Sequence, residues 1–76
     1  TTAPELVGRE IHKHLDAGLQ RLPPRQAQVI TLRDMHGLNY EEIAWETGLN
    51  LAQVKVYLHR ARKAMRTYLV RPSLLA

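Results

Sequence analysis

The chain contains no cysteine, so neither a disulfide bond nor a thiolate metal ligand is available to it. It has no apolar run near the roughly 20 residues that a membrane-spanning helix requires, and it shows no signal-peptide pattern. With 76 residues, the chain can form at most one domain with a small core. We therefore expect a single cytoplasmic domain that does not associate with membranes.

The residue patterns of catalytic and metal-binding sites are missing as well. There is no glycine-rich phosphate loop, and no histidine is paired with a nucleophile. His12 and His14 would point to different sides of a helix, and no third metal ligand accompanies them. We expect no catalytic residues, no metal and no cofactor, and hence a protein that is not an enzyme.

Acidic residues are absent after Glu46. Residues 1–46 hold seven acidic and five basic side chains, which gives −2, whereas residues 47–76 hold six basic side chains and no acid, which gives +6. A basic segment on a small domain is typical of a nucleic-acid-binding surface. The alternative is a solvated face that binds nothing, but charges of both signs would be expected there.

The basic residues belong to a segment, residues 51–69, that reads as one long helix because neither glycine nor proline interrupts it. Asn50 can cap its first turn, and Gln53 can complete a capping box. At about 100° per residue, apolar and basic side chains fall on opposite faces. The apolar face comprises Leu51, Val54, Leu58, Ala61, Met65 and Leu69. The opposite face comprises Ala52, Val56, His59 and Lys63, flanked by Lys55, Arg60 and Arg66.

Two further helices are expected nearer the N-terminus. Apolar residues at helical spacing predict a helix over residues 4–21, and the two prolines after Leu22 separate it from a second helix over residues 24–36. Gly37 would end this second helix in the left-handed conformation. Apolar side chains cover several sides of the second helix, so we expect it at the centre of the core, with Met35 filling a gap.

A helix-turn-helix is expected where a short third helix, residues 40–47, leads into the long helix. Asn39 and Glu42 can form a capping box at the start of the short helix. Ala44 is small enough for two helices to approach closely, and Gly48 can take the positive φ of a tight turn. These features predict an all-α, four-helix domain with a C-terminal helix-turn-helix.

Three stretches of sequence together resemble a known family. They are Leu-Pro-Pro-Arg-Gln at residues 22–26, Gly-Leu-Asn-Tyr-Glu-Glu-Ile-Ala at residues 37–44, and Val-Lys at residues 54–55 with Leu-His-Arg-Ala-Arg-Lys at residues 58–63. The pattern resembles the C-terminal domain (region 4) of bacterial sigma factors, most closely the extracytoplasmic-function group. The resemblance covers about residues 5–70, and the Leu-His-Arg-Ala-Arg-Lys run is its most specific part.

The resemblance implies recognition of the minus-35 promoter element for transcription initiation, with the second helix of the motif in the major groove of double-stranded DNA. It also implies docking to the RNA polymerase core through the flap of the β subunit, and binding by an anti-sigma factor. Residues 1–76 would then be one DNA-binding domain, a fragment of a longer sigma factor. The promoter-melting domain would lie outside this chain, which could not initiate transcription alone.

The early residues of a recognition helix lie deepest in the major groove, so they are the candidates for contacts with base edges. The base candidates are Gln53, Lys55, Val56 and His59, with Arg60 at the boundary. Phosphate contacts are expected from Arg25, Tyr57, Arg62, Lys63 and Arg66.

Three residues depart from the pattern of this family. Val56 and Tyr57 stand where many relatives have a small residue and an arginine, so Val56 is expected to meet a thymine methyl and the Tyr57 hydroxyl a phosphate. Trp45 stands where relatives usually carry a polar residue. We expect the Trp45 indole to contact a partner or another domain rather than the core.

Two alternative functions remain open at this point. The Glu-Ile-Ala and Val-Lys features are also similar to the DNA-binding domain of LuxR-type response regulators, although the Leu-Pro-Pro-Arg-Gln and Arg-Ala-Arg-Lys runs favour a sigma factor. The other alternative is a protein-interaction module in which the helix-turn-helix is occluded. Titration with promoter DNA would separate this module from the DNA-binding proteins.

Overall fold

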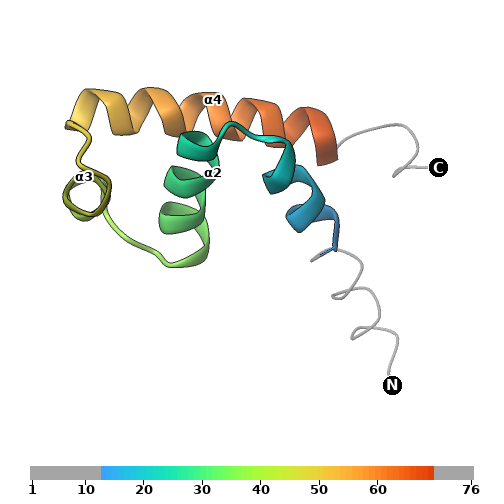
Figure 1. The fold of residues 1–76 in the computed structure, drawn as a ribbon, viewed down its shortest axis with the longest axis horizontal. Coiled ribbons are helices and arrows are strands. Elements are labelled where there is room, and N and C mark those ends of the chain that lie inside the picture. Colours follow the sequence, from blue (N-terminus) through green and yellow to red (C-terminus); the bar gives the residue numbers. More distant parts are fainter. Residues whose placement is uncertain (1–12, 70–76) are drawn as a thin grey trace, which may run out of the picture.

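The computed structural model describes residues 13–69, which form helices joined by short loops. Residues 13–21 are helical, α2 spans Pro24–Ile30 and continues into the π-helix η1 (Thr31–Met35), α3 spans Tyr40–Thr47, and α4 spans Leu51–Leu69. In Figure 1, α4 runs along the upper edge of this part, and the other helices lie along one side of it. The expected all-α architecture is confirmed. Over the described range, no helix combines the length and apolarity needed to cross a membrane.

α3 begins and ends as its local sequence predicts. Asn39 Oδ1 accepts the N–H of Glu42 at 2.8 Å, and Glu42 Oε1 accepts the N–H of Asn39 at 2.9 Å. Gly48 ends α3 with a φ of 73°, in the left-handed region where glycine avoids the clash of a β-carbon. The predicted boundaries of α3 are therefore confirmed.

The core lies where α2, α3 and α4 meet. Val29 of α2, Ile43 of α3 and Val54 of α4 have no exposed surface. Full burial of an apolar side chain of this kind stabilises a fold by roughly 1.5–3 kcal/mol. The other buried members of the core are Leu22, Ile30, Leu58, Ala61 and Met65. α2 contributes two buried residues to the core and α4 contributes four, so α4 rather than the second predicted helix is the main element of the core.

The predicted first helix is described from residue 13 onward, and its part before that, with His12, lies outside the described residues. Gly18 is buried, and a β-carbon built on it would lie 2.9 Å from both Sδ and Cε of Met65. The helical segment 13–21 therefore approaches α4 closely at Gly18.

The prediction of one regular α-helix after the two prolines is wrong in its second half, which is the π-helix η1. The N–H of His36 donates to the carbonyl of Thr31 at 3.2 Å, one residue further back than in an α-helix. The N–H of Leu38 then donates to the carbonyl of Leu32 at 3.0 Å, and Arg33 Nη1 donates to the carbonyl of Leu38 at 2.9 Å. These loop contacts hold the wider turn in place.

Two apolar side chains lie outside the core that the sequence assigned to them. Met35 is 51% exposed, because the wider turn of η1 shifts it away from the buried face of α2. Leu51 is 43% exposed, because it is the first residue of α4 and burial begins at Val54. The rest of the predicted apolar face of α4 is buried, apart from Leu69, which is half-buried.

Candidate nucleic-acid interface

Hydrogen bonds fix the turn that joins α3 to α4. The Thr47 hydroxyl donates to the carbonyl of Ile43 at 2.6 Å and accepts the N–H of Leu49 at 3.3 Å. Thr47 is the buried polar side chain of the core, and these two bonds satisfy a group whose burial would otherwise be costly. Thr47 thus links the last turn of α3 to the loop that leads into α4.

α4 begins with the predicted capping box. The N–H of Gln53 donates to Asn50 Oδ1 at 2.8 Å, and the N–H of Asn50 donates to Gln53 Oε1 at 3.0 Å. Two backbone donors of the first turn are therefore satisfied by side chains. The start of α4 is ordered before any partner binds.

All five residues predicted to contact base edges are exposed on α4. They are Gln53, Lys55, Val56, His59 and Arg60. Their spacing along one helix places them within the same half of its surface. Val56 is 44% exposed, so this surface carries one apolar side chain among four polar or charged ones. The structure therefore brings these residues together on one continuous surface.

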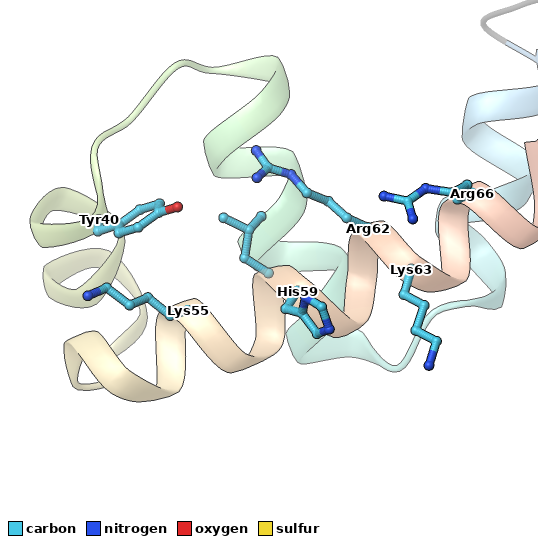
Figure 2. A pocket seen from close by; sticks show the side chains of 7 residues that line it. Tyr40, Lys55, His59, Arg62, Lys63 and Arg66 are labelled. Carbon is cyan, nitrogen blue, oxygen red and sulfur yellow. The ribbon is translucent and has the colours of Figure 1, made fainter.

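A hollow of about 480 Å³ lies between the start of α3 and the middle of α4. We call it the basic hollow; it is lined by Tyr40, Lys55, Leu58, His59, Arg62, Lys63 and Arg66. Figure 2 shows Lys55 beside Tyr40, Arg62 reaching toward the helix behind it, and Lys63 pointing the other way. Four of the lining residues are cationic and none is acidic, which suits a phosphate. Over residues 13–69, no three His, Asp or Glu side chains gather in a way that could hold a metal ion.

Arg62 is already engaged by a carboxylate. Its Nη2 and Nε donate to Oδ1 and Oδ2 of Asp34 at 2.6 and 3.3 Å, so the guanidinium and the carboxylate meet at two points. The hydrogen bond with Asp34 raises the pKa of Arg62 above its ordinary value. The sequence does not predict the role of Asp34, because no local pattern connects residues 28 positions apart. The contact with Asp34 uses Nε and Nη2 of Arg62 and leaves out Nη1.

The remaining phosphate candidates occupy different surroundings. Lys63 and Arg66 are exposed on α4. Arg25 is exposed at the start of α2 and donates through Nη1 to Gln28 Oε1 at 3.0 Å. Tyr57 is only half-buried, but its ring packs against the core, so its phenol contributes to stability as well as to the surface.

Tyr40 is a lining residue that the sequence did not single out. It is the first residue of α3, and its ring lies under the guanidinium of Arg33, 5.4 Å from the ring centroid. A cation over an aromatic face is attracted by the ring. Because Tyr40 is the first residue of the helix-turn-helix, its position in the sequence could have indicated that it lies at this surface.

A second hollow, of about 270 Å³, lies between the helical segment 13–21, α2 with η1, and the end of α4. We call it the apolar groove; it is lined by Leu15, Leu19, Ile30, Asp34, Met35, Arg62, Met65, Arg66 and Leu69. The sequence does not predict this groove, because the pattern of the second helix places Met35 in the core. Arg62 and Arg66 line the basic hollow as well, so the two surfaces adjoin along α4.

Trp45 is exposed, as the sequence predicts. Its side chain is 87% exposed on α3, where it makes no contribution to the core. Glu41, Glu42 and Glu46 are exposed on the same helix, and α3 carries no basic residue. This part of α3 is therefore distinct in charge from the basic surface of α4.

Comparison with known proteins shows which family the domain is similar to. Residues 12–65 match the family model described as "Sigma-70, region 4". The chain is 41% identical over 59 residues to the ECF RNA polymerase sigma factor SigE of Mycolicibacterium smegmatis. This alignment covers 78% of the chain and 23% of SigE. It is 41% identical over 70 residues to the RNA polymerase sigma factor SigV of Bacillus subtilis, which covers 88% of this chain and 42% of SigV. No solved structure matches the chain.

The chain thus spans less than half the length of either of these relatives. The matched residues include the turn between α3 and α4 and most of α4 itself. The match agrees with a sigma factor rather than with an enzyme or a LuxR-type response regulator. The chain belongs to the sigma-70 region 4 family of transcription initiation factors.

Proposed function

We propose that this chain is the DNA-recognition domain of an extracytoplasmic-function sigma factor, and that it binds the minus-35 element of cytoplasmic promoter DNA. The observation that supports this proposal is the exposed face of α4, the second helix of the helix-turn-helix. This face is basic, and α4 contains no acidic residue. A helix of this kind enters the major groove with its first residues deepest. Residues 1–76 would form one domain within a longer sigma factor.

The contacts divide along α4. Gln53, Lys55, Val56 and His59 would meet base edges, with Arg60 at the boundary of the groove. Lys63 and Arg66, further along the helix, would bind phosphates, as would Arg25, Tyr57 and Arg62. For Arg62, the bond to Asp34 occupies Nε and Nη2, so the phosphate would be held by Nη1.

RNA polymerase core would dock on a different part of the domain. The apolar groove offers exposed Met35 beside half-buried leucines, and none of the predicted base-reading residues lines it. An apolar segment of the β-subunit flap would be its occupant. Trp45 would contact a protein partner, either the polymerase or an anti-sigma factor, because an indole that is 87% exposed is costly to leave in water.

The first test is selection of duplexes from a randomised library, followed by titration of the selected and a scrambled duplex. We expect tighter binding to the selected duplex. If about four to six phosphates are neutralised, log K should fall with log salt at a slope near roughly −4 to −5. Failure to bind any duplex would favour the protein-interaction module instead.

A further inference from the structure

The capping box at the start of α4 fixes which atom of Gln53 faces outward. A backbone N–H can only donate, so the atom of Gln53 that lies 3.0 Å from the nitrogen of Asn50 must be the carbonyl oxygen, Oε1. The reciprocal bond from Gln53 N–H to Asn50 Oδ1, at 2.8 Å, holds both residues in place. Gln53 is exposed, and its Nε2 donors are not used by the cap.

Base edges in the major groove differ in what they offer to a donor. Guanine presents O6 and N7 as acceptors, adenine N7, and thymine O4, whereas cytosine presents only the N4 donor. A free glutamine commonly binds adenine through both ends of its amide, accepting from N6 and donating to N7. The cap holds Oε1 of Gln53 against the backbone, so the accepting half of that pair is missing.

We propose that Gln53 reads its base as a hydrogen-bond donor only, and that the backbone N–H of Asn50 enforces this polarity by holding Oε1 of Gln53. The position facing Gln53 must therefore carry an acceptor, cytosine is rejected there, and adenine has no advantage over guanine. This inference rests on the proposed function, because it requires the start of α4 to lie in the major groove.

Gln53→Glu changes the outward atom and keeps the cap, whereas Gln53→Met removes both the outward donor and the oxygen that accepts the N–H of Asn50. In Gln53→Glu, one carboxylate oxygen can still accept the N–H of Asn50, as glutamate commonly does in a capping box, while the outward atom becomes an acceptor. In Gln53→Met, the outward group has a similar length but makes no hydrogen bond of this strength. The charge control is Gln20→Glu, which adds the same charge at an exposed position of the helical segment 13–21.

The experiment measures the affinity of each variant for the selected duplex with all four bases placed in turn at every position. For the unsubstituted domain we expect one position where cytosine lowers affinity by roughly two- to tenfold, the range of a single neutral hydrogen bond. Gln53→Met should lose discrimination at that position alone. Gln53→Glu should weaken every duplex but prefer cytosine there, and Gln20→Glu should keep the original preference.

Three results would overturn the inference. The first is that Gln53→Met keeps the original base preference at every position. The other two concern the unsubstituted domain at the position where Gln53→Met loses discrimination: a preference for cytosine, or a preference for adenine over both guanine and thymine. If Gln53→Glu binds too weakly to measure, Gln53→Met alone decides. The proposed function fails separately, if the unsubstituted domain does not distinguish the selected duplex from a scrambled one.

Discussion

Asp34 and Arg62 are separated by 28 positions in the sequence, yet their side chains meet at two points, with Nη2 of Arg62 2.6 Å from Oδ1 of Asp34. The contact joins η1 to α4 beside the basic hollow. A DNA phosphate that approaches Arg62 therefore meets a guanidinium whose charge is already compensated. The Asp34 carboxylate and a DNA phosphate therefore compete for the guanidinium of Arg62.

Replacing Asp34 by asparagine should increase affinity for DNA. The change removes a negative charge beside Arg62, so selected and scrambled duplexes should gain in the same proportion, and the salt slope should become steeper by up to about one unit. Stability should fall by less than about 1 kcal/mol, because both partners of the ion pair are nearly half exposed. Titrations at several salt concentrations and a urea melt measure the two effects.

The matched control for this variant is Glu46→Gln, which removes one exposed carboxylate from α3. If Glu46→Gln raises affinity as much as Asp34→Asn, the gain is only an effect of net charge. If Asp34→Asn weakens binding, the carboxylate positions Arg62 for the phosphate and does not compete with it.

A second prediction separates base contacts from phosphate contacts on α4. Lys55→Ala should cost about 1–3 kcal/mol on the selected duplex and reduce discrimination between sites. Arg66→Ala should weaken all duplexes alike and make the salt slope shallower by about one unit. Both side chains are exposed, so the melting temperature should hardly change. Equal losses on selected and scrambled DNA for both variants would show that α4 does not read bases.

A third prediction concerns the two ends of the apolar face of α4. Leu58 is 2% exposed, so Leu58→Ala should destabilise the fold by roughly 2–4 kcal/mol through lost packing and a cavity. Leu51→Ala should cost less than about 1 kcal/mol, because Leu51 is 43% exposed. Urea denaturation of the two variants compares them directly. A large effect for Leu51→Ala would mean that this side chain is buried in solution.

The exposed Leu51 and the correctly predicted residues around it show which features of the fold a local sequence pattern can predict. Both capping boxes, the left-handed Gly48 and the buried positions from Val54 to Met65 depend on residues within one or two turns of each other, so their pattern is local. The exposure of Leu51 depends on which helices stand opposite α4, and spacing along one helix carries no information about that.

Neither the π-helix nor the Asp34–Arg62 pair could be predicted from the sequence, because both depend on contacts outside the local helix pattern. η1 is held by hydrogen bonds that Leu38 and Arg33 make across the following loop, and helix propensity alone favours the regular α-helix. Met35, the last residue of η1, is exposed and lines the apolar groove. The basic residues of α4 could be read from the chain, but the carboxylate that meets one of them could not.

A fourth prediction uses Trp45, the only tryptophan of the chain. Because its side chain is 87% exposed, iodide should quench its fluorescence almost as strongly as that of free tryptophan. Addition of polymerase core or of a cognate anti-sigma factor should reduce the quenching, whereas duplex DNA should leave it unchanged. Strong protection in the isolated domain would place Trp45 in the core and remove the proposed partner contact.

The capping box at Asn50 also bears on the thermodynamics of association. The first turn of α4 is already hydrogen-bonded in the free domain, so this turn does not have to fold when DNA binds. Coupled folding would appear in calorimetry as a large negative change in heat capacity, together with an entropy loss from the newly ordered backbone. The first turn of α4 should add nothing to that signature when DNA binds, because its backbone is already ordered in the free domain.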